Sequence, residues 1–184
     1  LVVSPHYTKS TFLKMIDNEI VNASVGKEAY IKIKMNSFTS YKMIDKLYEA
    51  SRAGVKIQMI VRGLCCLIPG VKGMSENIEV ISVIDKFLEH SRIYIFGNND
   101  DSKLYISSAD WMTRNIENRV EVSCPIYDEE IKKEIIDTFN ISWSDNVKAR
   151  ILNDSQENEY RVNNELKVRS QFAVYDYYLK QLEN

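Results

Sequence analysis

The sequence contains only two histidines, His6 and His90, whose imidazole rings could carry phosphoryl or proton-transfer chemistry. His6 follows a proline near the start of the chain, and a lone histidine is usually structural or exposed. His90 lies two residues before Arg92, so both side chains project to one face of an extended strand. Because a guanidinium binds phosphate oxygens through paired hydrogen bonds, this spacing predicts a phosphate-handling site around His90.

A polar block follows at residues 105–115, which read Tyr-Ile-Ser-Ser-Ala-Asp-Trp-Met-Thr-Arg-Asn. It places small hydroxyl groups, a carboxylate and an amide at the end of an expected strand, where they suit ordering a histidine and binding phosphate oxygens. These supporting candidates are Ser107, Ser108, Asp110 and Asn115. Since Asp110 would repel a phosphate, we expect its carboxylate to orient His90 or Arg92. The same residues could instead form a turn that caps the edge of the sheet.

Two expected strands end in polar residues at the edge where open α/β sheets bind ligands. The strand over residues 29–35 ends with Lys34 and Asn36, and the strand over residues 55–61 ends at Arg62. Side chains at neighbouring parallel strand ends approach one crevice. We therefore expect these three residues to bind phosphate, although a surface salt bridge is the commoner role of an arginine.

Hydrophobic periodicity predicts the elements that position these residues. Apolar residues at helical spacing predict helices over residues 8–23, 40–50, 128–141 and from 170 onward, with a short helical stretch over 85–88. Further strands are expected over residues 78–83, 92–96, 103–107 and 119–123, with a hairpin turn at 97–101. The helix–strand–helix–strand order of the first half predicts parallel pairing with helical crossovers. We therefore expect one α/β domain over residues 1–184, with a mixed β-sheet flanked by helices.

The composition supports one ordinary globular domain and excludes several kinds of protein. Of 184 residues, 45% are apolar and 27% charged, and the net charge of −2 gives no general basis for nucleic-acid binding. We find no transmembrane segment and no signal peptide pattern. The three cysteines, Cys65, Cys66 and Cys124, lack metal-site spacing and predict reduced thiols, with the adjacent two forming a small buried pair. The chain opens on an apolar segment without a methionine, which suggests part of a longer protein.

The His90 and 107–110 segments resemble the phospholipase D superfamily, whose motif is His-x-Lys followed by a Gly-Ser-x-Asn-like segment. Here Arg92 stands where the lysine belongs, and Ser-Ser-Ala-Asp replaces the second segment. A guanidinium and an ammonium are not interchangeable, so these departures argue against general phosphodiesterase activity.

Taken together, several blocks resemble the carboxy-terminal domain of bacterial polyphosphate kinases. They occur in the order expected for that family and span nearly the whole chain. The blocks are residues 34–37, 61–67, 87–92, 107–115, 147–150 and 168–171. The resemblance implies a phospholipase-D-like fold.

In that family two such domains form a tunnel for ATP and polyphosphate, and the earlier one carries the histidine that becomes phosphorylated. The resemblance implies that Arg62 and His90 contact nucleotide phosphates and that Arg119 is a further phosphate-binding arginine. His90 would be an acid/base or phosphate-ordering partner opposite the phosphohistidine. Magnesium ligands are expected in the earlier domains, so no metal site is assigned. This chain alone is then expected to lack kinase activity.

The resemblance also implies partners. ATP or ADP, inorganic polyphosphate and the N-terminal domains of the same protein are the expected partners, with homo-oligomers in the intact protein. The net charge argues against nucleic acid as a partner, and the reduced thiols predict a cytoplasmic location, with peripheral membrane association of the intact protein left open.

Two alternatives remain from the residues themselves. The first is a single-motif phosphodiesterase or nuclease that completes its site by homodimerisation. The second is an anion-binding scaffold in which His90 is only structural. The reaction direction, the preferred nucleotide, the oligomeric state of this chain and the roles of Lys148, Arg150 and Arg169 stay open.

Overall fold

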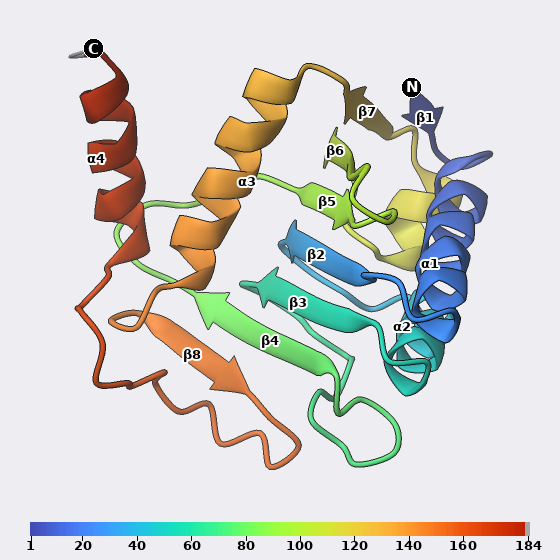
Figure 1. The fold of residues 1–184 in the computed structure, drawn as a ribbon, viewed down its shortest axis with the longest axis horizontal. Helices are drawn as coiled ribbons and strands as arrows, with labels where there is room; N and C mark the ends of the chain where they lie inside the picture. The colour runs from blue at the N-terminus through green and yellow to red at the C-terminus, as the bar shows by residue number, and fades with distance from the viewer. Residues whose placement is uncertain (183–184) are drawn as a thin grey trace.

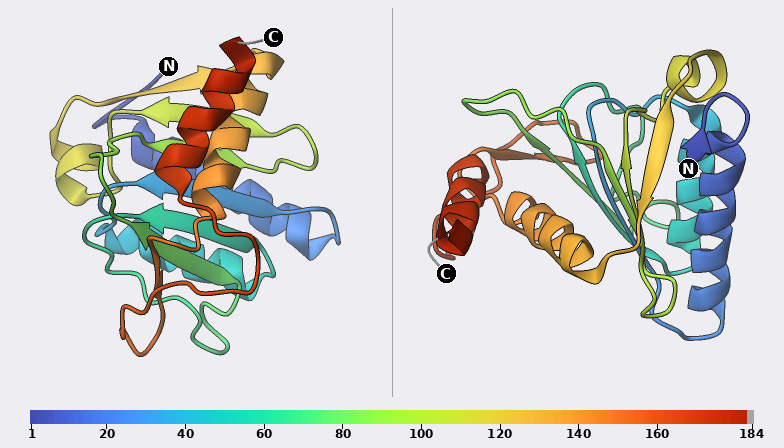
Figure 2. Two further views of the ribbon diagram at one scale, coloured as in Figure 1. Left: turned by 90° about the vertical axis from the view of Figure 1, so that its left-hand side faces the viewer. Right: turned by 90° about the horizontal axis from the view of Figure 1, so that it is seen from above.

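An eight-stranded mixed sheet, in the order β1-β7-β6-β5-β2-β3-β4-β8, runs through the computed structural model, which describes residues 1–182 (Figure 1). The strands are β1 (Val2–Val3), β2 (Tyr30–Met35), β3 (Lys56–Val61), β4 (Ile78–Val83), β5 (Ile93–Phe96), β6 (Lys103–Ser107), β7 (Val122–Ile126) and β8 (Ala149–Leu152). The helices are α1 (Thr8–Ser24), α2 (Tyr41–Arg52), α3 (Glu129–Trp143) and α4 (Ser170–Leu182), with a π-helical turn, η1, at Arg114–Asn118. Figure 2 shows α1 and α2 on one face of the sheet, and α3 on the other face with α4 beyond it.

The alternation of residues along β2 divides the interior into two unequal cores. Ile31, Ile33 and Met35 are buried with Phe12 and Ile16 of α1 in the larger core. The intervening residues project to the opposite face. There Lys32 lies beneath α3 and donates a hydrogen bond to Asn140 over 2.9 Å. The predicted mixed sheet flanked by helices is therefore confirmed.

The strand directions bring four separate chain segments to one edge of the sheet. β2, β3 and β4 are parallel, so the carboxyl ends of β2 and β3 lie side by side. β5 runs antiparallel to β2 with Lys34 opposite Ile93, so the residues preceding β5 approach the end of β2. Ser107, at the end of β6, donates its N–H to the carbonyl of Arg92 over 3.0 Å. This edge is where the polar candidates converge.

The structure corrects four local expectations. Residues 85–88 form no helix, and the strand predicted over 119–123 lies at Val122–Ile126 because the η1 turn occupies the preceding residues. β8 was missed because it is a short strand of four residues next to β4, within a polar sequence. Cys66 is exposed and Cys65 half-buried, so the two thiols are not a buried pair. No helix within residues 1–182 is long and apolar enough to cross a membrane.

Asp145 joins the end of α3 to β8 and α4. This fully buried carboxylate accepts hydrogen bonds from the backbone N–H groups of Val147, Lys148 and Ala149 at one oxygen and of Ser170 at the other. Burial acts to raise the pKa of Asp145, but these backbone donors outweigh it, so the pKa lies below the ordinary 3.8. The charged carboxylate therefore stabilises the turn before β8 and the start of α4 together.

Replacing Asp145 with asparagine is expected to lower the free energy of unfolding at pH 7 by about 1.5–3 kcal/mol, because the amide removes the charge and offers one acceptor oxygen in place of two. Since the folded pKa is depressed, this contribution is present above the unfolded pKa and is lost as pH falls through the folded one. The difference between wild type and variant should thus shrink below the ordinary pKa of 3.8. Urea unfolding of both proteins from pH 7 to pH 3 measures it, and a pH-independent difference would contradict the assignment.

Candidate functional site

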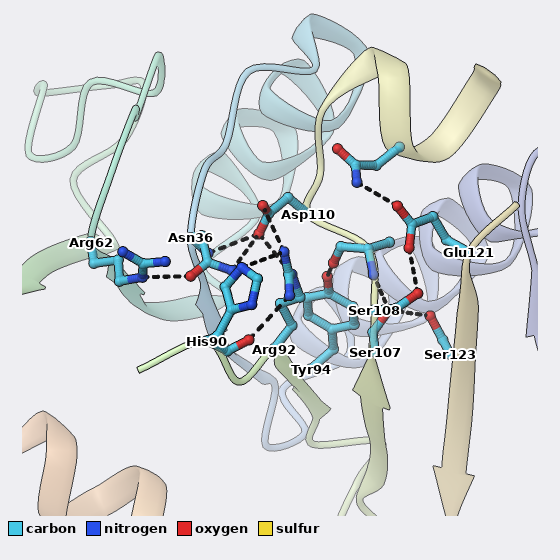
Figure 3. Close-up of polar contacts among 12 residues, drawn as sticks. Asn36, Arg62, His90, Arg92, Tyr94, Ser107, Ser108, Asp110, Glu121 and Ser123 are labelled. Atoms are coloured by element: carbon cyan, nitrogen blue, oxygen red, sulfur yellow. Dashed lines mark hydrogen bonds and ion pairs between the residues drawn. The ribbon is translucent and has the colours of Figure 1, made fainter. Parts of the chain in front are cut away.

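A buried carboxylate, Asp110, ties the end of β2 to the residue before β5 (Figure 3). One oxygen accepts the backbone N–H of Asn36 at 2.8 Å and the Nε of Arg92 at 3.1 Å, and the other accepts a terminal nitrogen of Arg92 at 3.2 Å. The Asp110 and Arg92 side chains are only 8% and 12% exposed. The carboxylate therefore holds Arg92 in a fixed, charge-paired position, as expected for an orienting group.

Arg92 in turn contacts His90. One terminal nitrogen donates to the carbonyl oxygen of His90 at 3.1 Å, and the other lies 3.3 Å from its Nε2. Because a guanidinium has only donors, a hydrogen bond between these two atoms requires Nε2 to be the acceptor. His90 is exposed, and no residue within 1–182 hydrogen-bonds to its Nδ1. Arg92, not Asp110, thus orients the imidazole directly and leaves one edge of the ring available.

Arg62 approaches the same cluster from the end of β3. Its Nε donates to the side-chain oxygen of Asn36, whose amide nitrogen lies 3.3 Å from Asp110. The backbone of Gly63 comes so close that an added Cβ would lie 2.8 Å from the carbonyl oxygen of Asn36, so this approach requires glycine. The terminal nitrogens of Arg62 have no partner within residues 1–182. Their paired donor geometry suits an oxygen of a phosphate.

Lys34 lies in the same region, but its charge is already paired. Its ammonium forms an ion pair with Glu89 and lies 3.3 Å from the hydroxyl of Ser142, and its side chain is only 12% exposed. Within the described chain, both Lys34 and Arg92 are thus neutralised by a neighbouring carboxylate. Among residues 1–182, Arg62 has no such carboxylate partner.

The other supporting candidates form a second cluster around Glu121, a residue that the sequence analysis did not single out. Glu121 accepts a hydrogen bond from the hydroxyl of Ser108 and, at 2.6 Å, one from the amide of Asn115. Ser107 lies 2.7 Å from the hydroxyl of Ser123 (Figure 3). A lone carboxylate between two valines, Val120 and Val122, was the available signal. These residues chiefly join β6 to β7.

Arg119 is exposed at the end of η1 and makes no hydrogen bond or ion pair with any residue of the described chain. The structure does not bring it into contact with the His90 cluster, which consists of His90, Arg92, Asp110, Asn36 and Arg62. The phosphate-binding role of Arg119 stays a prediction. Two of the cations left open have structural partners. Arg150 lies 3.9 Å above the ring of Tyr160, and Arg169 pairs with Asp85.

A cleft of about 590 Å³ opens beside the His90 cluster, between the sheet and the helices α3 and α4. Its lining includes the polar residues Lys34, His90, Arg92 and Ser107 and the aromatic residues Phe139 and Tyr178. This volume falls within the range of about 300–1,000 Å³ typical of small-molecule sites. The cleft can admit a phosphate-bearing ligand to the exposed edge of His90.

Comparisons with known proteins identify the family of the chain. Residues 1–171 match the family described as Polyphosphate kinase C-terminal domain 2. The chain is 50% identical over 184 residues to the polyphosphate kinase of Vibrio parahaemolyticus, covering all of this chain and 26% of that protein. It is 46% identical to the polyphosphate kinase of Escherichia coli K12, covering 27% of that protein. The chain thus spans about a quarter of the length of these relatives.

Solved structures give the same result. The crystal structure of polyphosphate kinase from Porphyromonas gingivalis superposes with a TM-score of 0.95 at 42% identity, over 99% of this chain and 28% of that one. Nuc, a phospholipase D family member from Salmonella typhimurium, superposes with a TM-score of 0.60 at 15% identity, over 83% of this chain and 95% of that one, which shows the shared fold alone. The chain belongs to the polyphosphate kinase C-terminal domain family and has a phospholipase-D-like fold.

Proposed function

We propose that this chain contributes phosphate-binding residues to the reversible transfer of the ATP γ-phosphoryl group to polyphosphate. Its relatives are named polyphosphate kinase. The observation that carries the proposal is the pair of terminal nitrogens on Arg62, which have no partner within residues 1–182. Asn36 holds this side chain at the same end of the sheet as the exposed imidazole of His90 (Figure 3). A fixed, unpaired guanidinium beside an imidazole suits a multiply charged phosphate chain.

The reaction would proceed in two balanced transfers. The bond between the β,γ-bridging oxygen and the γ-phosphorus of ATP breaks as a phosphorus–nitrogen bond forms to a histidine on another domain, and ADP leaves. The phosphorus–nitrogen bond then breaks as a terminal polyphosphate oxygen attacks. Arg62 would neutralise charge on the transferring oxygens, and His90 would exchange a proton with them through its free ring edge. Arg92 and Asp110 would position His90.

The remaining phosphate-binding candidates take supporting roles in this proposal. Asn36 would hold Arg62, and Lys34 would contribute charge only if a phosphate displaced its partner Glu89. Arg119 would bind a phosphate group further along the polyphosphate. Ser107, Ser108 and Asn115 would keep β6 and β7 in register behind the site.

Mg²⁺ is the expected cofactor of the complete enzyme, and we propose that its protein ligands lie outside this chain. Within residues 1–182 no three His, Cys, Asp or Glu side chains come together as a metal centre. The nearby carboxylates of Asp110 and Glu121 already accept hydrogen bonds from this chain. We therefore derive no step through Mg²⁺ from these residues, and its ligands would lie in other domains and on the phosphates themselves.

The proposal includes partners and a location. ATP or ADP and polyphosphate would be the substrates, and the other domains of the same protein would complete the site within a homo-oligomer. The free state of Cys65, Cys66 and Cys124 supports a reducing compartment such as the cytoplasm.

Replacing Arg62 with alanine is expected to weaken binding of tripolyphosphate to this chain by about 10–100-fold, because charge-assisted hydrogen bonds of about 1.5–3 kcal/mol are lost. Isothermal titration calorimetry at constant ionic strength measures the change. Arg62→Lys should recover part of the affinity, since it keeps the charge but not the paired donors. Arg52→Ala, an exposed arginine of α2, is the matched control.

Equal binding by wild type and Arg62→Ala would contradict the assignment of Arg62. Cleavage of a chromogenic phosphodiester by the chain would count against the kinase proposal and favour a hydrolytic enzyme.

A further inference from the structure

The segment that carries His90, residues 84–92, is held in place almost without backbone pairing of its own. It contains no helix or strand, and residues 85–91 make no backbone–backbone hydrogen bond within the described chain. Its large apolar side chains do not anchor it either, because Ile84, Phe87 and Leu88 are 70%, 56% and 77% exposed. Since exposed backbone without burial opens easily, the position of His90 must depend on contacts from elsewhere.

A buried side-chain amide at the start of α4 supplies the main contact. The Phe87 N–H donates to Oε1 of Gln171 at 2.8 Å, and Nε2 of Gln171 donates to the Phe87 carbonyl at 2.8 Å. The amide therefore pairs with this residue as a neighbouring strand would, while Gln171 itself is only 8% exposed. Figure 1 shows the segment between β4 and β5 passing beside the base of α4.

A second contact lies two residues earlier. Arg169 donates two hydrogen bonds of 2.7 Å to the two oxygens of Asp85, whose side chain is 4% exposed. Hydrogen bonding to Arg169 lowers the pKa of Asp85 below its ordinary value. The start of α4 is itself fixed, because Asp145 accepts the Ser170 N–H at 2.7 Å.

We propose that Gln171 is a positioning residue for His90, which acts through the backbone of Phe87 with the Arg169–Asp85 pair as a second anchor. Residues 85, 87 and 89 are each held by a side chain from elsewhere, respectively Arg169, Gln171 and Lys34. His90 follows residue 89 directly, so its imidazole contacts Arg92 only if the backbone of residues 85–89 keeps this conformation. The inference rests on the proposed function only in that His90 takes part in phosphate chemistry.

The test compares Gln171→Leu with wild type in the chain of residues 1–184. Leucine fills a similar volume but can make neither hydrogen bond, so amide exchange at Phe87 should accelerate on the order of tenfold. The NMR signals of the His90 ring should shift, and tripolyphosphate affinity should fall severalfold. Gln171→Glu keeps an acceptor for the Phe87 N–H but loses the donor, so it should give an intermediate result. Gln181→Leu makes the same chemical change further along α4 and should leave all three readouts at wild-type values.

The outcomes separate the two proposals. Unchanged Phe87 exchange and unchanged His90 signals in Gln171→Leu would overturn the positioning role, even if Arg62→Ala still lost tripolyphosphate. If wild type bound no tripolyphosphate while Gln171→Leu shifted the His90 signals, the proposed function would fail and the positioning role would stand. Protection of the backbone amides of β2 and β3 from hydrogen exchange shows whether each variant is folded. If Gln171→Leu does not fold, the same measurements on Gln171→Glu decide whether Gln171 positions His90.

Discussion

Replacing Asp110 with alanine is expected to lower the free energy of unfolding by about 3–5 kcal/mol, the cost of removing one partner from a buried ion pair. The Arg92 guanidinium, whose side chain is 12% exposed, would lose its carboxylate partner. The backbone N–H of Asn36 would lose its acceptor as well. Urea unfolding followed by circular dichroism measures this change.

A double variant separates the ion pair from the rest of the packing. Arg92→Met together with Asp110→Ala removes both charges, so it should be less destabilised than the sum of the single variants. Lys46→Met provides a control, because it removes a cation from an ion pair with an exposed carboxylate of Asp17. We expect that control to change stability by less than about 1 kcal/mol. If Asp110→Ala lowered the free energy of unfolding by as little as the control does, the buried ion pair with Asp110 would not be what stabilises the position of Arg92.

Replacing His90 with alanine is expected to reduce phosphoryl transfer by about 10²–10⁴-fold, the usual contribution of a positioned proton-transfer group. The measurement is the initial rate of ATP-dependent polyphosphate synthesis by a polyphosphate kinase that contains this chain as its C-terminal domain. Because His90 is exposed, the substitution should leave the fold intact.

Glutamine at position 90 tests which role His90 plays. Its side-chain oxygen can replace Nε2 as the acceptor for Arg92, but its amide cannot exchange a proton near neutral pH. If proton exchange is the role, His90→Gln should be as slow as His90→Ala. Near-normal transfer by His90→Gln would instead assign the residue to ordering the phosphate. His6→Ala, the only other histidine in the sequence, should retain the wild-type rate.

Local patterns in the sequence determined most of the fold. The alternation in residues 29–35 and the helical spacing in residues 8–23 both identify the face that enters the core, and each element formed with ends displaced by only one residue. Asp128 caps α3 by accepting the N–H groups of Glu130 and Ile131, which is a strictly local interaction. Such features depend on neighbours in the chain, so they can be read without the structure.

The arrangement of the site could be predicted only in part. The spacing of His90 and Arg92 indicated that they act together, and the acidic Asp110 was expected to orient rather than to bind phosphate. Both contacts are present. The short helix expected at residues 85–88 was wrong because the backbone of Phe87 is paired with Gln171, which lies 84 positions further along the chain.

The sequence by itself determined which residue types are available for phosphate chemistry, which family they match and which faces of the strands are buried. Only the tertiary structure decided which charges remain free. Lys34, Arg92 and Arg62 were all candidates for phosphate binding, but carboxylates distant in sequence neutralise the first two and leave Arg62 without an ionic partner within residues 1–182. The physical reason is that a charge is set by neighbours in space, and those neighbours come from strands, loops and helices that meet only in the folded chain.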